Sequence, residues 1–369
     1  MNNTKKILIA NRGVIAIRAL RAAKELGYEV ASVYSTADKN LKHLQLSDEA
    51  ICIGPPDSRD SYLNEAAIIS AAELANVDGI YPGYGFLAEN AEFAEKCKNS
   101  GFKFIGPSHE IISLMGDKIQ AKNLMRKLGV PVVPGYEGPV ESKEQIEDEV
   151  KKVGLPVIIK AAAGGGGRGM RIVRELSELW DAIEDARSEA NAAFGNDLVF
   201  IERYLEKPRH VEIQIFGDGK GNVVHLFSRD CSLQRKYQKV IEEAPAINIP
   251  DEKINEIYQI SVNACCELNY EGAGTLEFLY ENGEFFFIEM NTRIQVEHTV
   301  TEMITGVDLV QAQLELAMND VFDFDQSKIK INGHAMQCRI NAEDSNSFVP
   351  SPGRLWECHF PSGFGIRCD

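Results

Sequence analysis

No C-x-x-C pair occurs among the eight cysteines of this 369-residue sequence. Neither a zinc site nor a redox motif is therefore indicated, and the cysteines in apolar stretches are expected to be reduced core residues. A basic surplus is also missing, because 39 Lys and Arg stand against 55 Asp and Glu, which argues against a nucleic-acid-binding protein. No apolar run approaches a membrane span, and the one near the N-terminus is too short for a signal peptide. We expect a cytoplasmic protein with no membrane or nucleic-acid partner.

Strands and helices alternate in the first third of the chain, and no repeat or low-complexity tract is found. Short apolar runs predict the strands, and apolar residues three or four apart predict the helices. Such alternation with short connections is typical of a doubly wound parallel sheet, whose ligands bind beyond the carboxyl ends of the strands. Residues 11–13 and 83–86 follow two of these strands. The predicted strands are 7–10, 30–34, 79–82 and 104–107, and the predicted helices are 15–26 and 66–74.

A separate small lobe is predicted after this sheet. One helix is expected from about 113 to 128, and the lobe then runs from 131 to about 204, with apolar strands at 156–160 and 198–201. From residue 211 onward the hydrophobic pattern has mainly a two-residue period with hairpin signals, which predicts β-structure. The chain is long enough for two or three lobes.

Four consecutive glycines at 164–167 follow Lys160, which ends an apolar strand. Such a run frees the backbone to fold over an anion with its N–H groups turned inward, and Lys160 could reach a phosphate. The residue order is not that of a Walker A loop, and residues 171–173 continue as a strand. We interpret the run as a flap over a triphosphate; a mobile surface linker is the alternative.

Two acidic residues, Glu277 and Glu289, interrupt the apolar strands of a hairpin that turns at Asn282-Gly283. A two-residue turn would place Glu277 opposite Ile288 and turn Glu289 away, whereas a three-residue loop would put both carboxylates on one face. Two buried carboxylates repel, and Mg²⁺ with nucleotide phosphates would neutralise them, with a neutral oxygen from Asn291. The alternative is two solvent-facing carboxylates.

The segment that follows alternates Arg293, Gln295 and Glu297, which share one side of an extended chain. A guanidinium beside a carboxylate can hold a small oxyanion while the carboxylate takes its proton, although an ordinary ion pair would give the same pattern. The basic cluster at 229–239 favours a further anion contact. His210 stands alone, and a hydrogen-bonded structural histidine is at least as consistent with its context.

Taken together, these segments resemble biotin carboxylase, of the ATP-grasp family, over essentially the whole chain and in the same order. The resemblance implies an α/β fold with a doubly wound, Rossmann-like N-terminal domain at 1–115. An ATP-grasp domain follows at 116–330, with a mobile lid at about 132–204, and a β-rich C-terminal domain begins at 331–369. That last domain normally continues further in the family, so we expect a C-terminally shortened chain. The matching motifs lie at 9–13, 81–87, 114–118, 160–170, 208–212, 289–298 and 338–344.

The resemblance also implies a role for each matching residue. Nucleotide contacts are expected from Lys118, Lys160, Gly165, Gly166, Gly167, Glu202, Arg203, Leu205, His210 and Gln234. Glu277, Glu289 and Asn291 would bind one or two Mg²⁺ or Mn²⁺ ions. Bicarbonate would be held by Lys239, Arg293, Gln295 and the backbone of Val296. Glu297 would be the general base, and Arg339 would stabilise the enolate of biotin.

The implied reaction is the first half-reaction of acetyl-CoA carboxylase. In it a ligase uses ATP and bicarbonate to carboxylate biotin through carboxyphosphate. The sequence has no Met-Lys-Met biotinylation motif, so the biotin carboxyl carrier protein is expected on another chain, with a carboxyltransferase as a further partner. A homodimer is expected for the family, but part of the usual dimer surface would be missing here. A carboxylase for another acyl-CoA, pyruvate or urea, a carboxylate–amine ligase, and an ATP-binding protein without turnover stay open as alternatives.

Three residues depart from the family pattern. Val14 replaces an acidic residue, Tyr237 replaces a histidine and Thr299 replaces a proline. Tyr237 is aromatic and polar, so a ribose contact can survive there. Thr299 is expected to loosen the backbone beside the proposed base.

Overall fold

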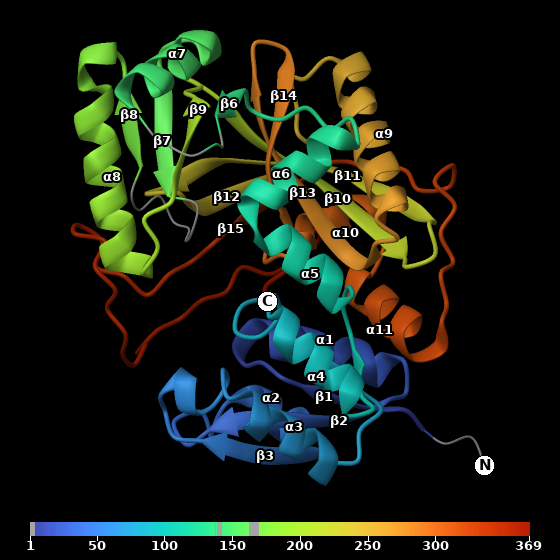
Figure 1. The fold of residues 1–369 in the computed structure, drawn as a ribbon. Coiled ribbons are helices and arrows are strands. Elements are labelled where there is room, and N and C mark those ends of the chain that lie inside the picture. Colours follow the sequence, from blue (N-terminus) through green and yellow to red (C-terminus); the bar gives the residue numbers. More distant parts are fainter. Residues whose placement is uncertain (1–3, 137, 139–141, 162–169) are drawn as a thin grey trace.

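The computed structural model describes residues 4–136, 138, 142–161 and 170–369. Its strands form sheets of five, six and four strands. The five-stranded sheet and its helices form the lower body in Figure 1, and the other two sheets lie side by side above it. Among the described residues, no helix combines the length and the apolar character that crossing a membrane requires.

The five-stranded sheet is fully parallel and has the order β3-β2-β1-β4-β5, which confirms the predicted doubly wound sheet. Ile7 and Ile9 of β1 pack into a core on one face with α1, whereas Leu8 packs on the other face with α3 and α4. This alternation buries both faces of the sheet. The strands are β1 (Lys6–Ile9), β2 (Glu29–Ser35), β3 (Glu49–Gly54), β4 (Gly79–Tyr81) and β5 (Lys103–Phe104); the helices are α1 (Gly13–Glu25), α2 (Lys42–Leu46), α3 (Glu65–Leu74) and α4 (Ala91–Asn99), with a 3₁₀ turn at Ser58–Asp60.

The single helix predicted from 113 to 128 is wrong, because two helices occupy this stretch. They are α5 (His109–Gly116) and α6 (Lys118–Lys127). Asp117 has an extended backbone, and its carboxylate accepts from the backbone N–H groups of Ile119 and Gln120 at 3.0 and 2.9 Å. An aspartate that caps a helix in this way satisfies donors that would otherwise be unpaired, so a new helix begins at Lys118.

The four-stranded sheet is antiparallel and has the order β6-β9-β7-β8. Helices α7 and α8 pack on it through Ile146, Val150, Leu179 and Ile183. Its elements are β6 (Gly135–Tyr136), α7 (Lys143–Val153), β7 (Val157–Ala161), β8 (Arg171–Val173), a 3₁₀ turn at Leu176–Glu178, α8 (Leu179–Phe194) and β9 (Val199–Arg203).

The six-stranded sheet is antiparallel, with the order β14-β13-β10-β11-β12-β15. Helix α9 covers one face together with α5 and α6, and α10 contacts β11, β12 and β15. Its strands are β10 (Arg209–Asp218), β11 (Val223–Arg235), β12 (Gln238–Ala244), β13 (Glu271–Glu281), β14 (Glu284–Asn291) and β15 (Ala335–Cys338); the helices are α9 (Asp251–Glu267), α10 (His298–Thr305) and α11 (Leu309–Asn319).

The β13–β14 hairpin satisfies neither of the two registers considered from the sequence. Its turn has two residues, Asn282 and Gly283, both with positive φ. The pairing nevertheless brings Glu277 opposite Glu289, because the register shifts by one residue between the pairs Phe278–Phe287 and Glu277–Glu289. Ile288 is the extra residue of this β-bulge.

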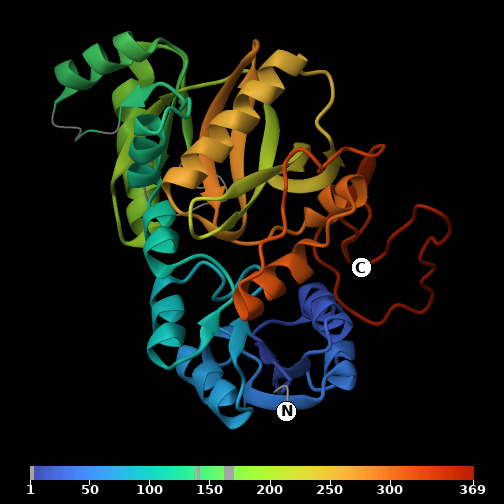
Figure 2. The ribbon, with the colours of Figure 1, turned by 90° about the vertical axis from the view of Figure 1, so that its right-hand side faces the viewer.

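The C-terminal segment after β15 forms neither helix nor strand among its described residues. It projects to one side of the molecule as an extended loop (Figure 2) and exposes Trp356, Phe360 and Phe364. Of the β-rich region predicted at 331–369, only β15 is therefore present as a strand.

The partly buried histidine of β11, His225, predicts a pH dependence of stability. Its ring stacks on Tyr258 with 4.4 Å between the ring centroids, and burial lowers its pKa from 6.5 to about 4. Below pH 6.5 the unfolded chain therefore binds a proton that the folded chain does not bind until about pH 4. Stability is lost across this window as the pH falls.

We expect His225→Gln to lose less stability than the unsubstituted chain between pH 6.5 and 4, as measured by urea unfolding at a series of pH values. Parallel curves for the two proteins would contradict the assignment of this acid-sensitive contribution to His225.

Candidate active site

A cavity of about 840 Å³ lies between the four-stranded and six-stranded sheets. It is bounded by β7 and β9 on one side and by β10, β12, β13 and β14 on the other. Gly165, Gly166 and Gly167, predicted in the flap, lie outside the described residues. The predicted site residues that line the cavity are Lys118, Lys160, Glu202, Arg203, Leu205, His210, Gln234, Lys239, Glu277, Glu289, Asn291, Arg293, Gln295, Val296, Glu297 and Arg339.

One end of the cavity carries lysines around a buried carboxylate. Glu202 of β9 is 1% exposed and forms ion pairs with Lys122 of α6 and, at 2.6 Å, with Lys160 of β7. Burial and the neighbouring Lys118 lower the pKa of Lys160 to about 8, although the charge of Glu289 opposes this shift. An anion that entered here would stabilise the charged form of Lys160.

The wall next to these lysines is apolar. Val133, Leu205 and Phe286 are buried together, and Leu279 and Ile288 pack against them. Most of these side chains line the cavity. The combination of an apolar wall and adjacent ammonium groups suits a ligand with a flat apolar part and an anionic part.

Glu277 and Glu289 share one face of the hairpin because they are directly opposed across β13 and β14. Glu277 accepts hydrogen bonds from Asn291 and Gln295 at 2.7 Å and from Lys239 at 2.9 Å. Burial opposes its ionisation, but Lys239 and His210 together lower its pKa far below the usual range. Burial and the charge of Glu277 raise the pKa of Glu289.

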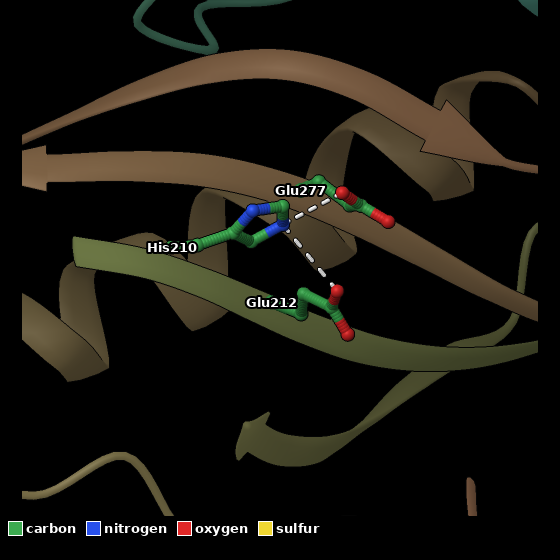
Figure 3. A group of neighbouring side chains, drawn as sticks. All are labelled: His210, Glu212 and Glu277. Atoms are coloured by element: carbon green, nitrogen blue, oxygen red, sulfur yellow. Dashed lines mark ion pairs between the residues drawn. The ribbon is translucent and has the colours of Figure 1, made fainter. Parts of the chain in front are cut away.

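His210 is not isolated, because it lies between two carboxylates (Figure 3). Its Nε2 is 2.7 Å from Glu277 Oε2 and 3.4 Å from Glu212 Oε1, and its Nδ1 is 3.0 Å from the side-chain amide of Gln234. Burial alone would lower its pKa, but the carboxylates of Glu212 and Glu277 raise it to about 9. At neutral pH His210 is therefore a cation.

The other end of the cavity is a cluster of opposite charges around Glu297, which immediately precedes α10. Glu297 is 2% exposed, and its two oxygens lie 2.9 Å from Lys239 Nζ and 2.9 Å from Arg339 Nη2. Arg339 also donates to Glu242 Oε1 at 2.6 Å. Burial opposes the charge of Lys239, but three carboxylates raise its pKa well above the usual value; these are Glu212, Glu277 and Glu297.

Arg293 faces the same cluster. It donates to Asn291 Oδ1 at 2.8 Å and to Glu89 Oε2 at 2.8 Å. Glu89 belongs to the segment after β4, so the N-terminal sheet and the cavity meet at this ion pair. A small oxyanion could replace one of these acceptors and bind the Arg293 guanidinium. It could likewise replace one of the carboxylates that contact Lys239.

Several charged residues of the site escaped prediction because their partners lie far away in the sequence. Glu89 is 204 residues from Arg293, and Arg339 is 97 residues from Glu242. Glu212 was visible only as an acidic residue in an otherwise apolar β-strand, a signal that also identified Glu277. The missed residues are Glu89, Lys122, Glu212 and Glu242, whereas Arg229 belongs to the basic cluster at 229–239 for which an anion contact was predicted.

The donor set at the hairpin fits a divalent cation. Two carboxylates on one face are oxygen ligands that Mg²⁺ and Mn²⁺ accept. The amide oxygen of Asn291 accepts from Arg293 while its N–H₂ group donates to Glu277, so this oxygen would join the ligands once the amide turned toward the cation. The raised pKa of Glu289 shows the repulsion that such a cation would relieve. Glu277, Glu289 and Asn291 therefore fit the predicted metal site.

The three departures from the family pattern lie at different depths. Val14 is half exposed near the start of α1. Tyr237 is 66% exposed at the cavity, in the β11–β12 turn, where Lys236 and Tyr237 both have positive φ. Thr299 lies in the first turn of α10 and donates to Gln337.

Two protein-family models match the chain. The model described as "Biotin carboxylase, N-terminal domain" matches residues 3–112, and "Carbamoyl-phosphate synthase L chain, ATP binding domain" matches residues 117–323. The biotin carboxylase of Haemophilus influenzae is 58% identical over 366 residues, covering 99% of this chain and 82% of that protein. One component of the pyruvate carboxylase of Methanothermobacter thermautotrophicus is 50% identical over 365 residues, covering 99% and 74%.

A solved structure has the same fold. The biotin carboxylase domain dimer of Hydrogenobacter thermophilus 2-oxoglutarate carboxylase, in complex with MgADP, ADP and bicarbonate, superposes with a TM-score of 0.92 at 46% identity. The match covers 100% of this chain and 81% of that one. The sheets and the cavity between them are those of an ATP-grasp ligase. Within that class, the chain belongs to the biotin carboxylase family.

The lysine cluster predicts a stability effect that an anion can reverse. Glu202→Gln removes the carboxylate between Lys122 and Lys160, so we expect the free energy of unfolding to fall by about 3–5 kcal/mol, the usual cost of breaking a buried ion pair. Inorganic triphosphate should restore part of the loss by binding the two ammonium groups. Both effects can be measured by thermal unfolding with and without triphosphate.

Glu206→Gln is the matched control, because Glu206 lies nearby and forms only an exposed ion pair with Arg174. It should leave the unfolding midpoint unchanged. If Glu202→Gln is equally silent, the carboxylate does not stabilise the lysines.

Proposed function

We propose that this chain carboxylates the biotin of a biotin carboxyl carrier protein, using ATP and bicarbonate, as the first half-reaction of acetyl-CoA carboxylase. The observation that carries the proposal is that one cavity joins the lysine cluster, the opposed carboxylates and the Lys239–Glu297–Arg339 cluster. The first two groups suit a metal-bound nucleotide, and the third suits a small oxyanion with a base beside it. The similar 2-oxoglutarate carboxylase domain was solved with MgADP and bicarbonate, which supports this division.

In this proposal ATP lies across the apolar wall with its phosphates at Lys118 and Lys160 and under the glycine loop. Glu202, Arg203 and Leu205 lie beside the adenine, and His210 and Gln234 lie near the ribose. Glu277, Glu289 and Asn291 would hold Mg²⁺ or Mn²⁺, which would screen the phosphate charges. The positive charge of His210 would add to that screening, since it faces the same carboxylate.

Bicarbonate would be held by Lys239, Arg293, Gln295 and the backbone of Val296. Glu297 would take its proton, because bicarbonate is a poor nucleophile until it is deprotonated. An oxygen of the anion would then attack the γ-phosphorus of ATP, releasing ADP and forming carboxyphosphate. A closed cavity would protect this intermediate from water. Carboxyphosphate would then split into CO₂ and phosphate, and the phosphate would take the proton of the biotin nitrogen. Arg339, already hydrogen-bonded to Glu297, would stabilise the resulting enolate of biotin as its nitrogen attacks CO₂.

The proposal also names the final acceptor of the carboxyl group. Acetyl-CoA carboxylase is our choice, and the similarity to components of a pyruvate carboxylase and of a 2-oxoglutarate carboxylase favours other acceptors as the second candidate. In each case a separate carrier protein and a carboxyltransferase would be the partners, and a homodimer would follow the 2-oxoglutarate carboxylase domain. The proposed domains are the N-terminal domain at 1–115, the ATP-grasp domain at 116–330 and the start of the C-terminal domain at 331–369.

Replacing the proposed base tests the chemistry. Glu297→Gln keeps the size of the side chain and removes the proton acceptor. We expect bicarbonate-dependent ATP hydrolysis, stimulated by free biotin, to fall by about 10²- to 10⁴-fold, the range for losing a general base. ATP affinity should change little, because Glu297 lies at the end of the cavity away from the lysine cluster. Steady-state kinetics and calorimetric ATP binding measure the two quantities.

Glu284→Gln serves as the control, because Glu284 is exposed at the start of β14, and its rates should equal those of the unsubstituted chain. A near-normal rate for Glu297→Gln would remove Glu297 as the base. An unsubstituted chain that binds ATP tightly but hydrolyses none in the presence of bicarbonate and biotin would refute the proposed activity itself.

A further inference from the structure

Arg229 occupies the middle of β11, and its side chain is fully buried. It belongs to the basic cluster at 229–239 for which an anion contact was predicted, but it does not line the cavity. A buried guanidinium is costly, and an apolar side chain of similar size often stabilises a fold as well or better.

All three guanidinium nitrogens donate hydrogen bonds. Nε and Nη2 donate to Glu212 Oε2 at 3.1 and 3.0 Å, and Nη1 donates to Gln214 and Thr301 at 2.7 and 3.0 Å. Nη2 also donates to Thr275 at 3.1 Å and to Gln295 Oε1. One side chain thus ties β10, β13, α10 and the segment before α10 to β11.

The contact with Gln295 fixes which way its amide points. A guanidinium only donates, so the amide oxygen must face Arg229. The amide N–H₂ group is then turned toward the cavity, where it donates to Glu277 Oε1 at 2.7 Å. Without Arg229 the amide could rotate and present its oxygen to the cavity, which would repel an anion.

The contact with Glu212 acts on a second residue of the same pocket. Arg229 binds Oε2 of Glu212, and Lys239 binds Oε1 of the same carboxylate. Glu212 is itself fully buried, so its position depends on these partners and on His210. Arg229 therefore sets the place of Lys239 through one intermediate carboxylate.

We propose that Arg229 is a positioning residue of the bicarbonate pocket: it orients the Gln295 amide as a donor and places Lys239 through Glu212. The inference rests on the function proposed above, because it assumes that the oxyanion held by these residues is bicarbonate. It assigns to a residue outside the cavity the geometry on which anion binding depends.

Arg229→Lys tests the geometry and keeps the positive charge beside Glu212. A single ammonium group cannot reproduce the planar fork that reaches all five partners. We expect the KM for bicarbonate to rise about tenfold or more, the effect of losing one hydrogen bond to a charged group. The KM for ATP should stay unchanged. The rise should be smaller when Arg229→Lys is added to Gln295→Ala, because the two changes remove one shared contact and only the route through Glu212 is left.

Thr301→Val is the matched control. It removes an acceptor of Arg229 on α10 and leaves the contacts with Gln295 and Glu212 in place. Its unfolding midpoint should fall, while both KM values stay unchanged. A parallel variant, Gln295→Glu, leaves Arg229 intact and can pair with it but lacks the amide donor, so its KM for bicarbonate should rise as for Arg229→Lys.

The outcomes separate this inference from the proposed function. If the unsubstituted chain shows no bicarbonate-dependent ATP hydrolysis, the proposed function fails. If it does, a folded Arg229→Lys with an unchanged KM for bicarbonate overturns only the positioning role, and so does an equal rise of both KM values, which would indicate general loosening of the sheet. Should Arg229→Lys not fold, an unchanged KM for bicarbonate in Gln295→Glu overturns the role instead.

Discussion

The arrangement of the cavity depends on one ammonium group that satisfies three buried carboxylates. Lys239 Nζ contacts Glu212, Glu277 and Glu297, which come from β10, β13 and the residue before α10. Burying a carboxylate is costly unless a cation lies beside it, and Lys239 supplies one for all three. Each carboxylate also has a cation of its own, namely Arg229, His210 or Arg339, but Lys239 alone contacts all three and so links two strands, one helix and the β11–β12 hairpin.

This compensation also explains how a polar centre can exist inside a sheet. The charges alternate from Arg229 to Glu212, then to Lys239, and then to Glu277 and Glu297. Each group has a neighbour of opposite sign, so the centre is held together without a ligand. A bound cation or anion would replace one of these partners in a site whose charged side chains are already in position.

Much of the fold could be predicted because its signals are local. The apolar strands and the helical spacing of apolar residues in α1 and α3 predicted a parallel sheet, and the observed strand order confirms it. The helix predicted from 113 to 128 was wrong because the apolar spacing continues across Asp117. Its carboxylate caps a second helix there. Glu277 and Glu289 were recognised as a pair, but no local pattern revealed the bulge that opposes them.

The charged partners of the site were less predictable for a different reason. Pairs such as Arg293–Glu89 and Arg229–Gln295 form only after separate parts of the chain have folded together. The motif around Arg293 indicated an oxyanion pocket, whereas the residues that orient that motif look like ordinary strand residues in the sequence. Resemblance to a family identified the residues that line the cavity, and the structure was needed to identify those behind them.

The bulge at Ile288 has one further consequence. In a regular strand, consecutive side chains point to opposite faces of the sheet, so an apolar residue and the acidic residue next to it in the sequence cannot share a face. With one residue added, Ile288 and Glu289 both border the cavity, the first against the apolar wall and the second beside Glu277. The apolar part of the cavity, which suits a flat ring, therefore meets the charged part at two adjacent residues of a single strand.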